Sequence, residues 1–360
     1  MLKIVSSIPL NIISRCLSSP FMLPISLAFN VSRNCNYRCK TCNIAESHDE
    51  GTMLTLDEIS VLFSSIGRSL YWITLVGGEP FLRKDLAEIC HIIYRHCAPK
   101  VINIPSNGSL PEETAACVKN IVSRCPKAHL FINLSLDGQE ARHDMIRNSP
   151  GAFKRLLRTY QALKALDYPQ VHVGISTVIS SYNIKEWAQI EAFIKTLSPS
   201  VHLFETAQLR DELKNMDRVE IVPRPSEALA LFKELLRRKQ LHKKGVIVRY
   251  QHAIRRNYYK LAESTLFTGR QSVPCFAGIA SAYILPDGKV WACSNHAWIM
   301  GDLRDYKFNF KKLWRSKVAQ QVRKQVKTNK CFCLQANANY LNLLHSPVYL
   351  GQIVKDFLLG

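Results

Sequence analysis

The sequence predicts an α/β protein, a partial (β/α)6 TIM-like barrel followed by a small C-terminal β-hairpin/helix domain. Three observations lead to the barrel. Six short apolar segments between residues 25 and 208 alternate with segments of helical spacing. Strict alternation of this kind gives parallel strands joined by right-handed crossovers. About 185 residues are too few for a complete eight-fold barrel, and the alternation stops after Arg210.

The expected strands are short and nearly continuous apolar runs, which is typical of strands covered by other elements. They lie at residues 25–31, 71–76, 101–106, 130–136, 171–179 and 201–208. Helices are expected between them, at 55–67, 83–97, 111–124, 152–166 and 184–197. The first of these begins with Thr55-Leu56-Asp57-Glu58, a capping-box pattern.

After the sixth strand the pattern changes. Residues 211–270 are basic and helical in spacing, and Pro286-Asp287-Gly288 forms a turn between two strands at 280–285 and 289–293. A basic helix is expected from Asn309 toward Cys331, and the last twenty residues are apolar with helical spacing. We therefore expect five parts: an apolar extension (1–24), the barrel (25–210), a basic connector (211–270), the auxiliary domain (271–335) and an apolar C-terminal helix (336–360).

Composition excludes several classes of protein. Of the 360 residues 47% are hydrophobic, which is enough for a large core and excludes a mainly disordered chain. The mean hydropathy of -0.06 argues against a transmembrane helix. The net charge is +20, and residues 233–260 and 307–330 contribute +9 each. Such stretches attract phosphates, anionic lipid or an acidic partner, or else form a solvated basic face.

Twelve cysteines need an explanation. The apolar N-terminus is a poor signal peptide, because Pro9 interrupts it, Arg15 follows and no small-residue cleavage site appears. We therefore expect a cytoplasmic protein, in which tight cysteine clusters are metal ligands rather than disulfides.

The first cluster is Cys35, Cys39 and Cys42. Soft thiolates suit an iron–sulfur cluster or zinc, and on spacing alone His48 could complete a zinc site. The cluster follows the first strand, and Gly77-Gly78-Glu79-Pro80 ends the second. Both segments therefore lie at the carboxyl edge of the barrel, where active sites of such barrels are built.

These segments resemble the radical S-adenosylmethionine (radical SAM) superfamily. CNYRCKTC at 35–42 and GGEP at 77–80 carry the resemblance, and Ser106-Asn107-Gly108 at the end of the third strand agrees. Further agreement comes from SLDG at 135–138, His143-Asp144, Arg147 and Gly151-Ala152-Phe153. The match runs from about residue 25 to 335, with departures at Val76 and Thr41, neither of which removes a ligand.

The resemblance implies a 4Fe–4S cluster held by the three cysteines and S-adenosylmethionine chelating its open iron. Glu79 would accept a hydrogen bond from the methionine amino group, and Ser135 and Arg147 would bind the carboxylate. Gly77, Gly78, Ser106 and Asn107 complete the expected cofactor-binding set. Reductive cleavage would yield a 5′-deoxyadenosyl radical that abstracts hydrogen from substrate, with electrons from a donor such as flavodoxin or ferredoxin. No catalytic residue beyond the cluster and cofactor site is expected.

A second set of cysteines resembles the SPASM/twitch extension of that superfamily. Cys275, Gly288 and Cys293 have its C-x12-G-x4-C spacing, and Cys331 and Cys333 follow the basic helix. Four thiolates suffice for one auxiliary 4Fe–4S cluster, which would transfer electrons or position substrate. The alternatives to this cluster are four buried free thiols or a zinc site. If Cys331 or Cys333 does not bind the cluster, one iron would be open to substrate.

The substrate is not apparent. Enzymes of the family that modify peptides often begin with a peptide-binding domain, for which the residues before the first strand are too few. This makes a peptide substrate less favoured, but a peptide-modifying maturase of the same superfamily stays an alternative. The apolar termini and basic stretches suggest an acidic, phosphorylated or lipid-linked substrate and peripheral contact with a membrane, unless the termini simply pack on the protein. No firm nucleic-acid signal appears. A non-enzymatic iron–sulfur scaffold or sensor is the alternative function. The remaining thiols are expected in the core: Cys16, Cys90, Cys97, Cys117 and Cys125.

Overall fold

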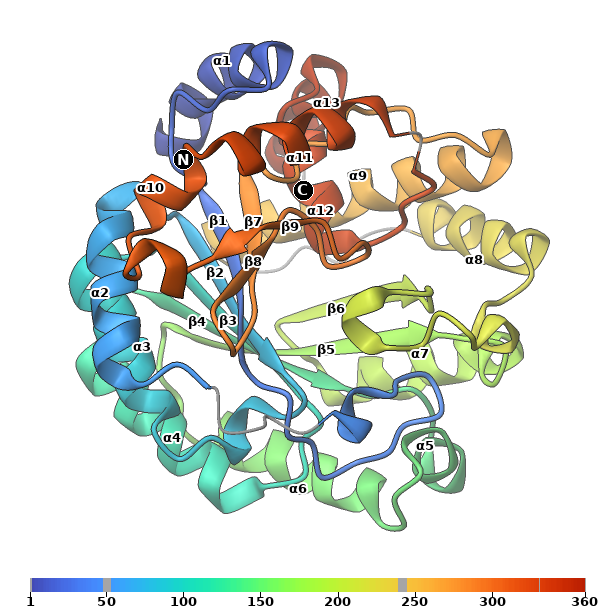
Figure 1. Cartoon of the computed structure of the whole chain (residues 1–360). Coiled ribbons are helices and arrows are strands. Elements are labelled where there is room, and N and C mark those ends of the chain that lie inside the picture. Colours follow the sequence, from blue (N-terminus) through green and yellow to red (C-terminus); the bar gives the residue numbers. More distant parts are fainter. Residues whose placement is uncertain (1, 48–52, 239–244, 330, 360) are drawn as a thin grey trace.

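The structure, a computed structural model, describes residues 2–47, 53–238, 245–329 and 331–359. Within these residues nine strands form one sheet in the order β6-β5-β4-β3-β2-β1-β7-β8-β9 (Figure 1). Strands β1 to β6 are all paired in parallel, as the alternating pattern predicts. The predicted fold class is therefore confirmed.

The six barrel strands lie within two residues of their predicted bounds. They are β1 Ser26–Ser32, β2 Trp72–Gly77, β3 Val101–Ser106, β4 His129–Ser135, β5 Val171–Ile179 and β6 Val201–Thr206. Parallel pairing places all their carboxyl ends at one edge of the sheet, so the loops after them meet there.

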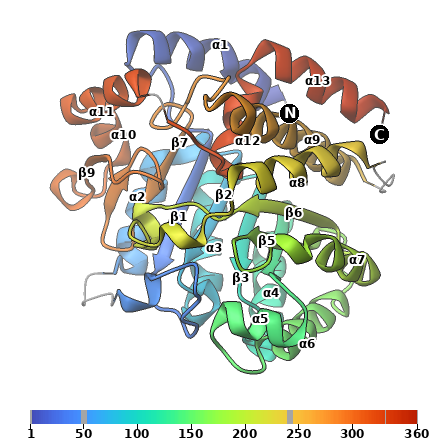
Figure 2. The ribbon, with the colours of Figure 1, turned by 90° about the vertical axis from the view of Figure 1, so that its right-hand side faces the viewer.

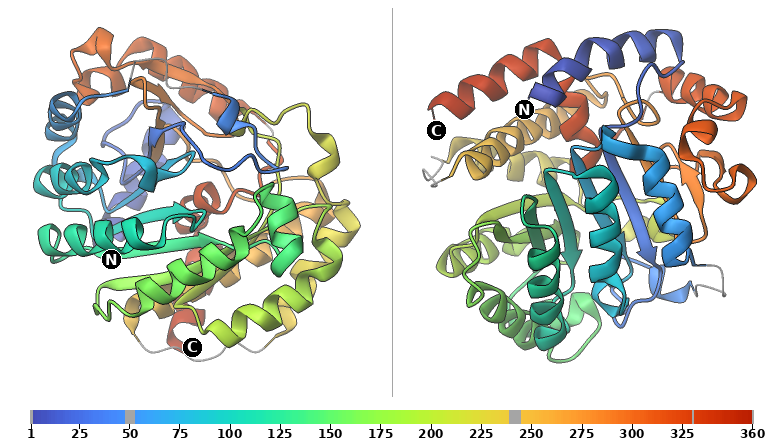
Figure 3. Two further views of the ribbon diagram at one scale, coloured as in Figure 1. Left: turned by 90° about the horizontal axis from the view of Figure 1, so that it is seen from below. Right: turned by 90° about the vertical axis from the view of Figure 1, so that its left-hand side faces the viewer.

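Crossover helices cover the outer face of this sheet, as the three views of Figures 1 and 3 show. They are α2 Leu56–Ile66, α3 Leu86–Cys97, α4 Pro111–Arg124, α6 Ala152–Lys164 and α7 Trp187–Leu197. The predicted capping box is present, because Thr55 and Glu58 each bond the other's backbone N–H. A further helix, α5 Glu140–Arg147, was not expected. Short 3₁₀ turns complete this description: Ile44–Glu46, Gly67–Ser69, Pro80–Leu82, Ile184–Glu186, Asp211–Leu213, Val219–Ile221 and Arg304–Tyr306.

The C-terminal hairpin continues the barrel sheet. Strands β7 Ser281–Ile284 and β8 Lys289–Trp291 pair antiparallel, as predicted, and a third strand, β9 Ile299–Asp302, adds to them. Strand β7 pairs in parallel with the free edge of β1, with Ser26 opposite Ser281. The auxiliary region therefore shares one sheet with the barrel.

Two predicted C-terminal helices are each divided in two. The basic helix becomes α10 Phe310–Trp314 and α11 Lys317–Thr328, because Ser316 caps a new helix by accepting from the Ala319 N–H. The apolar tail becomes α12 Ala336–Leu344 and α13 Pro347–Leu359. The division occurs there because Pro347 disfavours helical geometry at the residue that precedes it. The connector contains α8 Pro225–Arg237 and α9 Val246–Thr268.

The apolar N-terminus forms a helix, α1 Leu2–Leu17, in which Pro9 lies without ending it. Helices α1 and α13 lie next to each other at one end of the molecule (Figure 2). Among the described residues, no helix combines the length and the apolar character needed to cross a bilayer.

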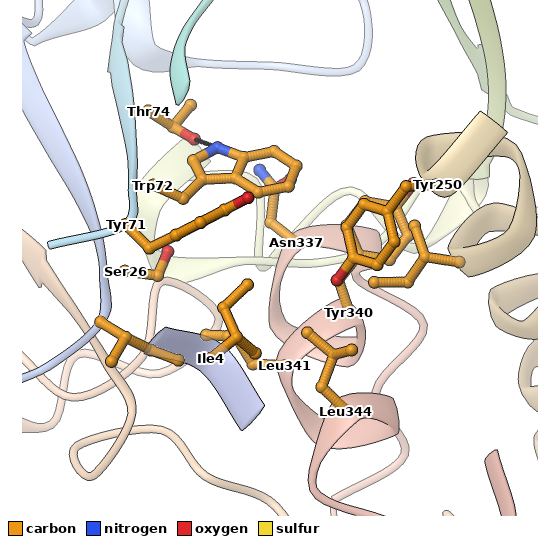
Figure 4. A pocket seen from close by; sticks show the side chains of 12 residues that line it. Ile4, Ser26, Tyr71, Trp72, Thr74, Tyr250, Asn337, Tyr340, Leu341 and Leu344 are labelled. Atoms are coloured by element: carbon orange, nitrogen blue, oxygen red, sulfur yellow. Dashed lines mark hydrogen bonds between the residues drawn. The ribbon is translucent and has the colours of Figure 1, made fainter. Parts of the chain in front are cut away.

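A small apolar cavity of about 40 Å³ lies at the amino ends of β1 and β2. Figure 4 shows Tyr71, Trp72, Tyr250 and Tyr340 around it, and the Trp72 indole donates to Thr74 Oγ1 at 3.1 Å. A space of this size holds a water molecule or two, not an organic ligand. It lies at the opposite ends of these strands from the carboxyl edge.

Candidate functional site

A cavity of about 250 Å³ lies at the carboxyl edge of the sheet. We call it the cofactor cavity. Its lining brings together residues expected at the site from the ends of four different strands: Cys35, Cys39, Cys42, Gly77, Gly78, Ser106, Asn107, Ser135 and Arg147. Because these residues are spread over more than a hundred positions of the chain, their convergence follows from the parallel topology.

The loop that follows β1 presents the three thiols. Cys42 N donates to Cys39 O at 3.1 Å, and Ile44 N donates to Cys42 Sγ at 3.4 Å. Burial raises the pKa of Cys35 to about 11 and that of Cys42 to about 12. The free thiols therefore hold their protons at neutral pH, and a metal that binds here must displace them.

Gly77 and Gly78 allow a close approach of two backbone segments. A Cβ at Gly77 would lie 2.3 Å from Ser32 O, and one at Gly78 would lie 2.3 Å from Asn34 O. Gly78 N donates to Ser32 O at 2.8 Å, and Glu79 N donates to Asn34 O at 2.8 Å. Both glycines also line the cofactor cavity, where the sequence predicts contact with a ligand. They therefore allow the close approach of the backbone that leads into the cysteine loop and also form part of the cavity surface.

Glu79 lies behind the wall of the cofactor cavity and is almost fully buried. Its carboxylate accepts from Phe81 N at 3.1 Å, from Ser106 Oγ at 3.0 Å and from Asn107 N at 2.6 Å. Burial raises its pKa to about 7 in spite of these bonds. A structural role in holding the turn after β3, which the sequence did not indicate, is therefore evident.

The same turn contacts the cysteine loop. Asn107 Nδ2 donates to Asn36 Oδ1 at 2.9 Å and lies 3.9 Å from Cys35 Sγ. Asn36 in turn donates to Ser109 Oγ at 2.9 Å. The amide of Asn107 is therefore fixed between the third strand and the first thiol.

Arg147, at the end of α5, provides a buried positive charge beside Cys39. Its Nη2 pairs with Asp137 Oδ2 at 2.6 Å, and its Nη1 lies 3.8 Å from Cys39 Sγ. Burial alone would lower the pKa of Arg147, but the negative charge of Asp137 outweighs burial, and the pKa is raised above its ordinary value. Among the described residues its buried Nε has no hydrogen-bond partner, so one donor remains for a ligand.

Another wall of the cavity is formed by the segment after β6, and the sequence did not predict its residues as part of the site. Gln208, Arg210 and Glu212 line it, and the buried Gln208 Nε2 and Arg210 Nε have no partner within the described part of the chain. Glu212 accepts from the Tyr283 hydroxyl at 2.7 Å. Charged side chains directly after a parallel strand were the available signal, because that position faces the carboxyl edge.

This wall connects the two groups of cysteines. Asn215 Nδ2 donates to Thr41 O at 2.9 Å in the first cysteine loop. Glu212 N donates at 3.2 Å to the carbonyl of Ser294, which follows Cys293. Gln208 Oε1 accepts from the N–H of Leu334, which follows Cys333, at 3.2 Å. The segment that carries Arg210 therefore contacts both cysteine loops.

Four thiols gather at the second site: Cys275, Cys293, Cys331 and Cys333. Burial raises the pKa of Cys275 to about 12 and also raises that of Cys333, and the other thiols of the set add to both effects. Hydrogen bonds surround them, among them Asn295 N to Cys293 Sγ at 3.3 Å. Cys331 Sγ also lies 3.5 Å from His296 Nε2. The structure thus brings together the set that the spacing suggested.

The other cysteines lie apart from both sites. Cys90, Cys97 and Cys125 are buried and Cys117 is half-buried, in agreement with core thiols. Cys16 is exposed on α1, so its assignment to the core was wrong.

Comparison with known proteins identifies two regions. A family model described as the radical SAM superfamily matches residues 29–194. A second, SPASM, described as an iron–sulfur cluster-binding domain, matches residues 275–335.

Relatives extend the similarity over most of the chain. The AdoMet-dependent heme synthase of Oleidesulfovibrio alaskensis is 25% identical over 308 residues, 80% of this chain and 74% of that protein. The AdoMet-dependent heme synthase of Methanosarcina barkeri is 26% identical and covers 81% of this chain and 82% of its own. The solved structure of native anSMEcpe with bound AdoMet has a TM-score of 0.60 at 17% identity, covering 93% of this chain and 96% of that one, which supports the fold.

The donors present suit the cofactors that these domains imply. Within the described ranges no three His, Cys, Asp or Glu side chains gather tightly enough for a single metal ion. His48 lies outside the described residues. A four-iron cluster is wider than one ion, and the three thiols stand around a cavity rather than against each other. The unpaired Arg147 Nε beside them suits an anionic group such as a carboxylate.

Proposed function

The chain belongs to the radical SAM superfamily and carries a SPASM domain, and on that premise we propose how its residues divide the work. Such an enzyme cleaves S-adenosylmethionine reductively at a 4Fe–4S cluster, and the resulting 5′-deoxyadenosyl radical abstracts hydrogen from a substrate. We assign Cys35, Cys39 and Cys42 to that cluster. The observation that carries this assignment is that all three thiols and Arg147 line one cavity.

The remaining cofactor contacts follow from the cavity lining. Arg147, held by Asp137, orients the methionine carboxylate, and Ser135 lies beside it in the lining. A carboxylate offers about four acceptor positions. Three groups already donate hydrogen bonds to the Glu79 carboxylate, so one acceptor position remains for the methionine amino group. Gly77, Gly78, Ser106 and Asn107 form the surface against which the rest of the cofactor lies.

We assign Cys275, Cys293, Cys331 and Cys333 to one fully ligated auxiliary 4Fe–4S cluster. Four thiols leave no iron open, so this cluster transfers electrons rather than binding substrate directly. The segment that carries Arg210 bonds to both cysteine loops, which supports a substrate held between the clusters. An external donor such as flavodoxin or ferredoxin supplies the electron that starts the reaction.

The wall formed by Gln208, Arg210 and Glu212 recognises the substrate. Its unpaired donors would meet an oxygen-rich or anionic group, since a buried guanidinium prefers such partners. The heme synthase relatives cover four fifths of this chain, so a heme precursor is the first substrate to assay and a peptide is the second. Arg210→Gln is expected to reduce product formation while cleavage of S-adenosylmethionine without substrate stays unchanged.

Iron content tests the ligand assignment. The anaerobically reconstituted protein is expected to bind about eight irons, from two four-iron clusters. Changing Cys35, Cys39 and Cys42 together to Ala should leave about four and abolish formation of 5′-deoxyadenosine. Cys16→Ala is the matched control, because this exposed thiol lies outside both sets. A triple variant that still binds about eight irons would contradict the assignment.

A further inference from the structure

Helix α1 buries a mostly polar face and exposes an apolar one. The side chains that it buries are mostly polar: Ile4, Ser7, Asn11 and Ser14, with Ser18 just beyond its end. These residues recur at helical spacing on one face. The opposite face is apolar and exposed, by between 36% for Ile12 and 58% for Leu17. A helix that met only water on its outer side would have the reverse arrangement.

Specific bonds hold the polar face of α1 against the protein. Asn11 Nδ2 lies 3.0 Å from His345 Nε2 at the end of α12, and Arg15 Nε donates to Cys275 O at 2.9 Å. Ser7 and Ser14 donate back to carbonyls of their own helix, at 2.7 Å each. The buried polar groups are thus satisfied, so the orientation is consistent with the rest of the chain and leaves the apolar face without cover.

The outer side of α13 adds to this apolar surface. Four of its apolar side chains are exposed, from 49% to 71%: Val348, Val354, Leu358 and Leu359. Figures 1 and 2 both show α13 next to α1 at the same end of the molecule. We call the exposed apolar side chains of these two helices the terminal face.

Basic helices border the terminal face on two sides. On one side α11 lies against the end of α1, where Lys327 Nζ donates to Cys16 O at 2.7 Å. Lys317 and Lys324 of α11 are exposed, and residues 307–330 contain no acid. On the other side Arg249 of α9 donates to Phe357 O at 2.7 Å, near the end of α13.

We propose that the terminal face docks on the surface of an anionic lipid bilayer. Exposed apolar side chains would enter the region between headgroups and acyl chains, and the bordering lysines and arginines would meet anionic headgroups. Charge complementarity selects this occupant over a second copy of the chain, because a symmetric dimer would bring the like-charged borders together.

This attachment fixes the orientation of the active site. α1 leads directly into the amino end of β1, whereas the cofactor cavity lies at the carboxyl ends of the strands. The cavity therefore opens on the side away from the bilayer. A docked enzyme would receive its substrate from water, so this geometry disfavours the lipid-linked substrate that the sequence suggested.

Vesicle flotation of the full chain, reconstituted and handled anaerobically, tests the proposal. Vesicles of phosphatidylcholine alone are compared with vesicles of phosphatidylcholine mixed with phosphatidylglycerol. Binding is expected to the mixed vesicles and to weaken with added salt. The triple variant Leu10→Gln/Ile13→Gln/Leu17→Gln should bind at least about tenfold more weakly, because the apolar insertion is lost.

Two matched sets of control variants distinguish binding through the terminal face from binding through exposed apolar or basic residues elsewhere on the surface. Val61→Gln and Val219→Gln change exposed apolar residues elsewhere and should leave binding unchanged. Lys324→Gln should weaken binding to the mixed vesicles about fivefold, whereas Lys119→Gln on α4 should not. Formation of 5′-deoxyadenosine by the triple variant should equal that of the wild type, which shows that the variant is folded.

Two outcomes would overturn the proposal. One is wild-type protein that floats with neither type of vesicle, or a triple variant that floats as well as the wild type. The other is a wild-type dimer in analytical ultracentrifugation that the triple variant converts to a monomer, since the face would then join two copies of the chain.

Discussion

Replacing Gly78 by alanine should displace the cysteine loop. A Cβ there would lie 2.3 Å from Asn34 O and 2.5 Å from Arg33 O, both backbone atoms that precede Cys35. Real Cβ atoms essentially never approach another atom within 3.0 Å, so the two segments must separate by most of an ångström. No side-chain rotation can relieve this contact.

The energetic cost can be worked from the bonds that join the two segments. Gly78 N to Ser32 O and Glu79 N to Asn34 O are both 2.8 Å long and would be stretched or broken. At about 1 kcal/mol each, the loss is roughly 2 kcal/mol. A loss of this size lowers the melting temperature by several degrees in a protein of more than 150 residues.

Two measurements check this prediction. Thermal unfolding of the cluster-free protein reports the loss of stability, and iron content after anaerobic reconstitution reports the position of the cysteine loop. We expect Gly78→Ala to melt several degrees lower and to retain only about the four irons of the auxiliary site.

Two glycine controls make the result specific. Gly351→Ala, within α13, places a Cβ in open space and should not lower stability or change iron content, because alanine favours a helix more than glycine does. Gly174→Ala places one 2.1 Å from Asn133 Oδ1, away from the cysteine loop, and should lower stability but retain both clusters. A Gly78→Ala protein with wild-type melting and full iron content would refute the close approach described here.

Three further predictions concern other parts of the molecule. Glu79→Gln should leave iron content intact but weaken S-adenosylmethionine binding about tenfold or more in titration calorimetry, because an amide is a poorer acceptor for an ammonium group; unchanged affinity would mean a purely structural acid. Burial and the charge of Arg147 lower the pKa of His143 to about 3, so its neutral ring favours folding above pH 6.5 and this contribution is lost as pH falls toward 3. His143→Gln should therefore make denaturant-measured stability less dependent on pH in that window, and an unchanged slope would contradict the assignment. Changing Cys275 and Cys293 to Ala should remove about half the iron and stop product formation while abortive cofactor cleavage persists; full product formation would make the auxiliary cluster purely structural.

Most of the barrel could be predicted because its elements are locally consistent. Apolar runs and a capping box place strands and helices within a few residues of their observed bounds. Helix α5 was missed because it buries only His143 and Ile146 and has no apolar stripe. Strand β9 was missed because it is four residues long and contains Gly301.

The site was predicted less completely, because spatial neighbours decide its details. Motifs identified the residues of the cofactor cavity, but the three donors that surround Glu79 come from the segment after it and from the turn after β3. The wall with Arg210 depends on the course of the chain after β6, which no motif marks. The inverted orientation of α1 is set by partners such as His345, more than 300 residues away in the sequence.

The pairing of β1 with β7 has a consequence for how the chain is made. During synthesis β1 emerges among the first segments, whereas the strand that covers its edge follows about 250 residues later. Until then β1 presents unpaired backbone groups and an apolar sequence along an open edge, the feature through which nascent sheets aggregate. Contacts of such separation also form slowly. The barrel cannot close this edge before the ribosome has produced Ile284, the last residue of the strand that covers it.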